Sequence, residues 1–169
     1  MKIKKQENHM LDWAKELFPV CRSLTGRGIQ FSLRYFKKIN PEFRLFKFKS
    51  GSKVYDWKIP LEWNINNGYF RHVKSQKRYC DFKKNNLHIL GYSMPVNKIV
   101  NKKDLIKNIF TQKEQPNSIP YVTSYYKKRW GFCMSENQKK KLPKGKYLAY
   151  IDSNFKKGKM EISEAILKG

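Results

Sequence analysis

The sequence predicts an α/β protein of mixed α+β character, in which two helices precede a mostly antiparallel β region and two further strands follow. Apolar residues recur at helical spacing over the first forty residues. From residue 51 to about residue 135, aromatic and short apolar runs alternate with turn residues, which is typical of short strands. With 169 residues, 40% of them hydrophobic and 15% aromatic, the chain is large enough to bury a core.

The first two elements are predicted as amphipathic helices. One is expected over residues 8–18, where apolar residues fall at helical spacing and Asn8 serves as the N-cap. In the second, Ile29, Leu33 and Phe36 form one apolar stripe. The loop CRSLTGRG joins the two helices, and its glycines permit backbone conformations that other residues resist.

The β region begins beyond Pro41, where EFRLFKFKSG predicts a strand followed by a turn. The short runs after it predict antiparallel strands that form a compact module. One helical interruption is expected at residues 102–110, because apolar residues recur there at helical spacing.

Two strands are predicted after this region. The segment KYLAYID is apolar on both faces, as in a sheet that is covered on both sides. In GKMEISEAILKG, the alternation of Met160, Ile162 and Ile166 predicts a strand that buries this side.

The formal net charge is +24, because 37 lysines and arginines outnumber 13 acidic residues. Lysine dominates this excess, and the basic residues are spread over the chain with no long run. A specific nucleic-acid reader tends to gather its basic residues on one face, so we interpret the charge as solvated surface. Nonspecific polyanion binding is the alternative.

The three cysteines, Cys21, Cys80 and Cys133, lie more than fifty residues apart without a CxxC pair, which predicts reduced thiols. The first residues contain no apolar segment of the secretory type, and no apolar run nears the length of a membrane span. We therefore expect a soluble cytoplasmic protein with no membrane partner.

Residue chemistry alone identifies no catalytic residue, metal ligand or cofactor site. The histidines, His9, His72 and His88, are not spaced three or four residues apart, as a helical metal-binding pair would be. No serine lies in a GxSxG motif, and no glycine loop of the phosphate-binding type is present.

Two stretches nevertheless combine polar and aromatic groups. In CRSLTG, Arg22, Ser23 and Thr25 crowd a helix-entry loop that could hold an anion, or the two hydroxyls cap the helix. In PYVTSYYKKRWGFC, residues 120–133, the rings either pack into the core as a β hairpin or form a rim that binds a ligand.

Five longer motifs are distributed along the chain from residue 17 to residue 169: LFPVCRSLTGRG, GSKVYDWKIPLEWNI, DFKKNNLHILGYSMPV, IPYVTSYYKKRWGFCMS and EISEAILKG. In these motifs the chain resembles a bacterial family of aminopeptidase-like proteins of unknown function in peptidase clan MH. The resemblance implies a zinc-aminopeptidase α/β core interrupted by an inserted, mostly antiparallel β domain. Residues 1–50 would begin the core, residues 51–135 would form the insertion, and residues 136–169 would return to the core.

The resemblance also implies that the metal ligands follow the strand that matches EISEAILKG. The chain is therefore expected to be an N-terminal fragment, truncated or split, that lacks these ligands and is inactive alone. Zinc is expected only in intact relatives, where metal-bound water would attack a peptide carbonyl. Arg27 departs from the family pattern, which would have an acidic residue there.

The same resemblance implies that the chain forms part of a substrate cleft. The family's frequent location near surface-polysaccharide genes suggests either a peptide or an aminoacylated sugar as substrate. The candidate cleft residues are Arg22, Ser23, Thr25, Tyr121, Thr123, Ser124, Tyr125 and Trp130.

Two other roles stay open at this point. A basic, noncatalytic module that binds polyanions or a partner chain would use the positive charge. A structural role would involve self-association or a complementing chain, because the final strand and the helix stripes need a covering layer.

Overall fold

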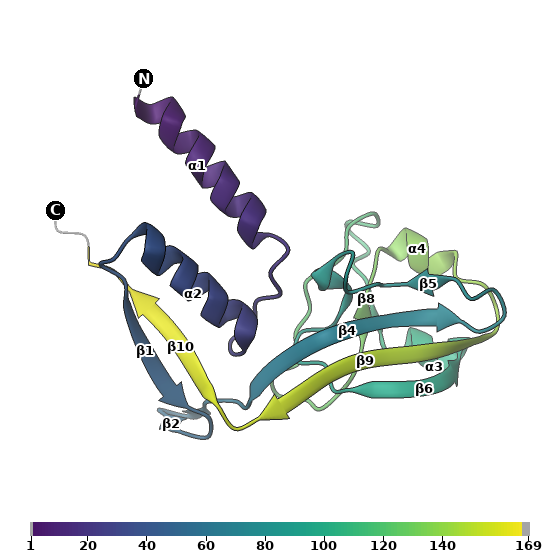
Figure 1. Ribbon diagram of the computed structural model, residues 1–169. Helices are drawn as coiled ribbons and strands as arrows, with labels where there is room; N and C mark the ends of the chain where they lie inside the picture. Colours follow the sequence, from purple (N-terminus) through teal and green to yellow (C-terminus); the bar gives the residue numbers. More distant parts are fainter. Residues whose placement is uncertain (1, 167–169) are drawn as a thin grey trace.

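The computed structural model describes the backbone of residues 2–166 and the side chains of residues 9–166. Figure 1 shows two helices at one end of an elongated molecule and a long sheet at the other. The chain begins with α1 (Lys2–Leu17) and α2 (Arg27–Ile39), followed by strand β1 (Arg44–Lys49). The two predicted helices and the predicted strand are thus present. Helix α1 starts six residues before Asn8, so the expected N-cap at Asn8 is wrong.

The main sheet has four antiparallel strands in the order β5-β4-β9-β6. Its strands are β4 (Glu62–His72), β5 (Arg78–Tyr79), β6 (Val96–Asn101) and β9 (Lys146–Lys156). The register of β4 against β9 shifts between Ile65 and Asn67, as in a β-bulge. Because β9 pairs with β4 and β6, the segment KYLAYID belongs to this sheet. The division into residues 1–50, 51–135 and 136–169 stays a prediction.

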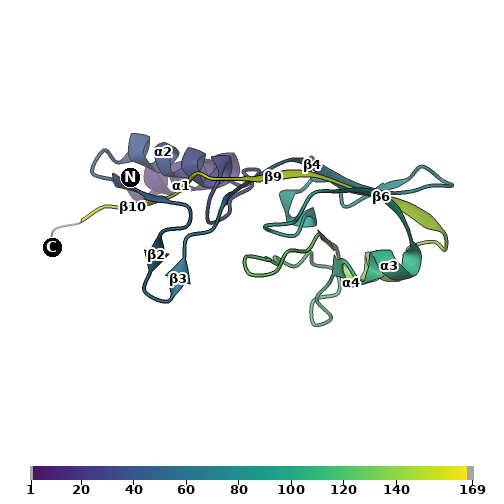
Figure 2. The same cartoon turned by 90° about the horizontal axis from the view of Figure 1, so that it is seen from below.

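Short elements cover one face of the main sheet, and Figure 2 shows α3 and α4 on that side. These elements are η1 (Asn86–His88), α3 (Lys102–Ile106), β7 (Ile109–Phe110), β8 (Phe132–Cys133) and α4 (Glu136–Lys140). The helix predicted at residues 102–110 is thus shorter than expected. It ends at Ile106, and Ile109 and Phe110 form β7 instead. Strand β8 pairs with β7 in parallel, so the hairpin predicted at residues 120–133 is wrong.

The core lies between the main sheet and these short elements. Phe70 of β4, Phe132 of β8 and Tyr147 of β9 are fully buried, and their rings meet edge to face. Burial alternates along β9: Tyr147, Ala149 and Ile151 face the core, whereas the residues between them are only half-buried. The expectation that both faces of KYLAYID are covered is therefore wrong.

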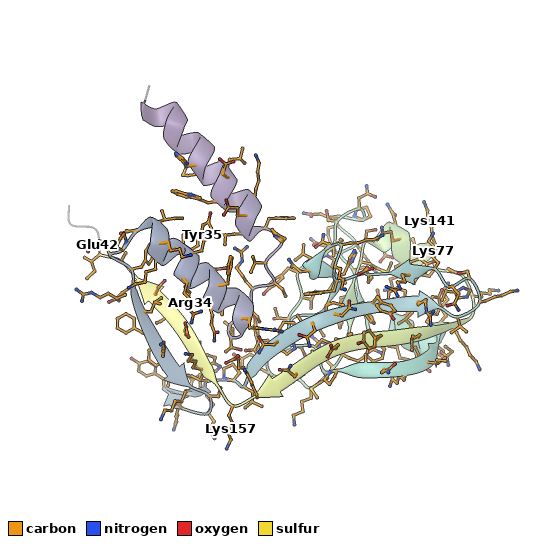
Figure 3. All side chains as sticks on the ribbon, in the orientation of Figure 1. Arg34, Tyr35, Glu42, Lys77, Lys141 and Lys157 are labelled. Atoms are coloured by element: carbon orange, nitrogen blue, oxygen red, sulfur yellow. The ribbon has the colours of Figure 1, made fainter. Side chains whose placement is uncertain are left out.

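A second, two-stranded antiparallel sheet pairs β1 with β10 (Lys159–Glu164), and α2 lies against it in Figure 1. The inward-facing side chain of β10 is Glu161, which is 2% exposed, while Ile162 and Ile166 are exposed. The prediction that the strand buries the side with Ile162 and Ile166 is therefore wrong. Arg34 of α2, which Figure 3 labels, lies 3.7 Å from the Glu161 carboxylate, and a buried carboxylate needs such a cationic partner.

A small hairpin, β2 (Lys53–Val54) and β3 (Trp57–Lys58), follows β1. Among the helices of residues 2–166, none has both the length and the apolar character needed to cross a bilayer.

Candidate functional site

The loop that connects α1 to α2 is fixed by a buried threonine. Thr25 Oγ1 accepts a hydrogen bond from the Trp63 N–H at 3.0 Å and shares one with the Tyr92 hydroxyl at 2.6 Å. The Tyr92 ring in turn stacks on Trp63, with their centroids 5.6 Å apart. Thr25 therefore ties the CRSLTG loop to β4 and to the loop that carries Tyr92.

The predicted capping role of Ser23 and Thr25 is wrong. The N-cap of α2 is Gly26, and no side chain of the loop caps it. Instead, Asn64 of β4 accepts a hydrogen bond from the Arg27 N–H at 2.9 Å. The cap thus comes from a distant segment, which local sequence patterns do not reveal.

Gly26 allows this close approach between the loop and β4. Its φ of +94° lies in the left-handed region, and a Cβ atom there would lie 2.1 Å from the Trp63 carbonyl oxygen. Arg27, which follows it, donates from Nη2 to Asn66 Oδ1 at 2.6 Å, and Asn66 donates to Asp152. The unexpected arginine is therefore held by polar groups of the main sheet.

The two predicted stretches meet at a groove over β10, which we call the Arg22 groove. Its lining includes Arg22, Ser23, Tyr121, Tyr125 and Glu161, and its volume is about 320 Å³. Arg22 and Tyr121 are exposed, whereas the Ser23 Oγ atom is buried and has no hydrogen-bond partner among residues 2–166. Buried hydroxyls are normally hydrogen-bonded, so Ser23 is a free polar group at a groove wall.

Tyr125 also lines a second hollow, which we call the Tyr92 groove. This groove has a volume of about 370 Å³ and is lined by Tyr92, Ser124, Tyr125, Tyr126 and Phe155, with Lys127 and Lys128 also contributing. Tyr125 meets Tyr92 edge to face at 4.8 Å, so the ring lies between the two grooves. The two grooves thus adjoin at one aromatic residue.

The phenols of Tyr92 and Tyr121 keep their protons at neutral pH. Burial raises the pKa of Tyr92 to about 12, although its hydrogen bond with Thr25 lowers the pKa in part. Burial and a hydrogen bond with Tyr125 also raise the pKa of Tyr121. Neither phenol therefore serves as a base at neutral pH.

Ser124 holds the aromatic stretch in place. Its Oγ donates to the Lys127 carbonyl at 2.5 Å and accepts from Arg129 Nε at 2.9 Å. Thr123 is half-buried and forms an isolated parallel bridge with Gly91. These two residues position the stretch.

Trp130 lies apart from the other cleft candidates. Its ring packs edge to face on Phe132 of the core at 6.0 Å, and Lys98 Nζ lies 5.4 Å above it. The structure thus brings together Arg22, Ser23, Tyr121 and Tyr125, but places Trp130 outside both grooves.

Glu161 is the groove residue that the sequence did not indicate. Its carboxylate lies 3.0 Å from Lys159 Nζ and 3.7 Å from Arg34 Nη2, and neither carboxylate oxygen accepts a hydrogen bond within residues 2–166. A lone acidic residue between two apolar strand positions was the available signal.

The described residues do not fit a zinc site. Among the side chains of residues 9–166, no three from His, Cys, Asp or Glu gather closely enough to hold a metal ion. His72 bonds through both ring nitrogens, to Ser75 Oγ at 2.8 Å and to the Lys144 carbonyl at 3.2 Å, so it is a structural histidine. His88 Nδ1 donates to the Cys133 carbonyl at 2.9 Å.

The fold is that of one region of a larger peptidase-like protein. A crystal structure from Clostridium acetobutylicum, provisionally described as a peptidase, matches with a TM-score of 0.88 and 36% identity. The match covers 94% of this chain and 37% of that chain. Residues 62–154 match the family model of a domain of unknown function, DUF2172. Since this match spans more than half of the chain, the protein belongs to the DUF2172 family.

In a comparison of sequences, a relative from Clostridium acetobutylicum is provisionally named a polysaccharide biosynthesis protein with an aminopeptidase-like domain. It is 40% identical over 155 residues, which cover 92% of this chain and 35% of that protein. The chain thus spans about a third of the length of these relatives.

Proposed function

We propose that this chain forms part of a zinc-dependent, aminopeptidase-like hydrolase of the clan MH type and supplies one wall of its substrate cleft. The observation that carries the proposal is the Arg22 groove, where two distant stretches present a guanidinium, a free hydroxyl and two phenols. In this proposal the metal ligands are not among residues 2–166, and the chain alone does not catalyse hydrolysis.

Each group of the groove has a distinct role in binding. Arg22, which is exposed, pairs with a carboxylate or another anionic part of the substrate. Ser23 donates or accepts one hydrogen bond, because its hydroxyl has no partner of its own. Tyr121 and Tyr125 offer ring faces and phenol donors.

The substrate carries an amino-acyl group, as part of either a peptide or an aminoacylated sugar. The relative's name, which joins polysaccharide biosynthesis to an aminopeptidase-like domain, supports the second. The aromatic Tyr92 groove beside the Arg22 groove suits the apolar face of a sugar ring or of a side chain.

A chimera tests the role of Arg22. This chain replaces the matching 155 residues of the Clostridium relative, and both proteins are assayed with aminoacyl amides and aminoacylated amino sugars. We expect the chimera to hydrolyse one substrate class, and Arg22→Ala or Ser23→Ala to raise KM about tenfold because a polar contact to substrate is lost. Arg44→Ala, an exposed arginine on β1, is the matched control and leaves KM unchanged.

Two results would reject parts of this proposal. If the relative itself hydrolyses neither class of substrate, the reaction class is wrong. If the chimera is active but Arg22→Ala and Ser23→Ala behave as Arg44→Ala does, the groove is not part of the cleft.

Partner surfaces are proposed on the two helices. Met10, Leu11 and Phe18 of the α1 segment are all more than half exposed, and so is Phe31 of α2. Exposed apolar residues on neighbouring helices favour contact with another protein surface. We propose that a further part of an aminopeptidase-like core or a second copy covers them.

Light scattering on the purified 169-residue chain tests this surface. We expect a mass above the 20.3 kDa of one chain, because the helices lack a covering layer. Leu11→Gln with Phe18→Gln is expected to return the mass toward 20.3 kDa, whereas Ile99→Gln on the exposed face of β6 is not. A single-chain mass for the unmodified protein at high concentration contradicts self-association.

We also propose a cytoplasmic location. The cysteines Cys21, Cys80 and Cys133 are all free, which suits a reducing compartment. Burial raises the pKa of Cys21 to about 11 and of Cys133 to about 12, so neither is a reactive thiolate at neutral pH.

A further inference from the structure

A basic pocket lies at the end of the main sheet, and it shares no lining residue with the Arg22 or Tyr92 groove. Its volume is about 330 Å³, and its lining includes Lys77, Tyr79, Cys80, Lys84, His88 and Lys141. Figure 3 shows Lys77 and Lys141 beside each other there, away from Lys157, which lies at the bend between β9 and β10. We propose that this pocket binds a small phosphorylated molecule, with its phosphate or pyrophosphate group held by Lys77, Lys84 and Lys141.

The charge of the pocket favours an anion. The three lysines come from separate segments, namely the turn before β5, the turn before η1 and the end of α4. None of them pairs with a carboxylate among the described side chains of residues 9–166. Asp81 is the single carboxylate in the lining, and its Oδ1 already accepts the Lys83 N–H at 3.0 Å. An anionic ligand would therefore neutralise an unbalanced positive charge.

Lysines are frequent in this chain, so positive charge alone does not identify a binding site. The stronger argument is that three lysines from separate segments border the same cavity. The Lys77 ammonium lies 5.5 Å above the Tyr79 ring, which places it on the pocket side of β5. Arg78 also lines the pocket, but its guanidinium lies 4.3 Å from the Tyr69 ring. Since side chains alternate along a strand, Arg78 points to the other face, and we assign it no ligand contact.

The floor of the pocket is fixed by shared contacts to one carbonyl. The Cys80 thiol and the His88 Nδ1–H both donate to the Cys133 carbonyl, at 3.5 and 2.9 Å. Cys80 has a φ of +51°, a conformation that costs energy for a residue other than glycine and often occurs at binding sites. Burial raises the pKa of the Cys80 thiol, so it adds no negative charge to the floor.

Size and shape favour a small phosphorylated ligand over a polymer. A volume of 330 Å³ is at the low end for ligand pockets, which suits a phosphate group with a sugar or a similar small body. Lysine ammonium groups commonly bind phosphate as point charges. A polyanion presents its charges along a line, whereas these lysines border a single hollow.

Calorimetric titration of the 169-residue chain with sodium pyrophosphate at fixed ionic strength tests the pocket. We expect saturable binding that Lys77→Gln combined with Lys141→Gln weakens about tenfold or more, because each removes a charged contact. Lys53→Gln combined with Lys157→Gln removes the same charge from exposed sites elsewhere and leaves the affinity unchanged. All four lysines are exposed, and circular dichroism verifies that both variants fold.

Two outcomes would overturn the proposal. Titration of the unmodified chain without saturable heat would show that the pocket does not hold a phosphate group. Equal weakening by the two double variants would show that pyrophosphate responds only to the overall charge of +24. Neither outcome bears on the cleft, because the pocket and the grooves share no residues.

Discussion

Gly26→Ala is expected to lower the free energy of unfolding by about 3 kcal/mol or more, which would unfold a marginally stable domain. The φ of +94° disfavours any residue with a Cβ, and that Cβ would lie 2.1 Å from the Trp63 carbonyl oxygen. Because the clashing atom is backbone in β4, side-chain rotation does not relieve it. The loop would move away from β4, and the Thr25 hydrogen bonds would break. Urea denaturation followed by tryptophan fluorescence measures the loss.

Gly51→Ala separates the cost of the left-handed backbone conformation from the cost of the contact with β4. Gly51 has a nearly equal φ of +88°, but an added Cβ would meet no atom within 4 Å. We expect Gly51→Ala to lower the free energy of unfolding by only about 1 kcal/mol, the cost of placing a residue with a Cβ in this conformation. Equal losses in both variants would contradict the close contact between Gly26 and β4.

The buried carboxylate of Glu161 predicts an asymmetric response to mutation. Its side chain is fully buried, whereas those of Arg34 and Lys159 are 51% and 39% exposed. Removing both cations leaves an uncompensated charge, so Arg34→Ala with Lys159→Ala is expected to destabilise by about 3 kcal/mol or more. Removing the acid instead leaves two cations that water can solvate, so Glu161→Met is expected to be neutral or stabilising.

The triple variant is the decisive comparison for Glu161. Glu161→Met added to the Arg34→Ala and Lys159→Ala variant is expected to restore most of the lost stability, because no charge remains buried. Lys107→Ala, which breaks the exposed pair with Asp104, is the control and is expected to cost less than about 1 kcal/mol. If Glu161→Met proves as harmful as the loss of both cations, the ion pair itself stabilises the fold.

Local patterns predicted the helices and most strands, but not their partners. The stripe of Ile29, Leu33 and Phe36 identified α2, because helical periodicity is a property of neighbouring residues. The β region lacks such a signal for long-range pairing. The sequence therefore did not indicate that β9 pairs with β4 and β6, or that β1 pairs with β10. The short β7 and β8 also formed where a longer helix and a hairpin were expected.

The candidate site was predicted as two separate stretches, and their meeting required the tertiary fold. Arg22 and Ser23 reach Tyr121 and Tyr125 because a buried hydrogen bond joins Thr25 to Tyr92, sixty-seven residues away. Trp130 was predicted as a cleft residue because it lies in the same aromatic stretch, but its ring packs on Phe132 of the core. Glu161 escaped notice because strand alternation favours apolar residues on the covered side.

The pairing of β1 with β10 has a consequence for synthesis of the protein. Lys49 faces Lys159 in the register, so β1 leaves the ribosome about a hundred residues before its partner. At about 5–20 residues per second, translation of the intervening chain takes several seconds or more. During that time Phe46 and Phe48 remain on a strand with two open edges, which invites contact with other nascent chains. The yield of soluble protein should therefore depend on chaperone supply more than its final stability would suggest.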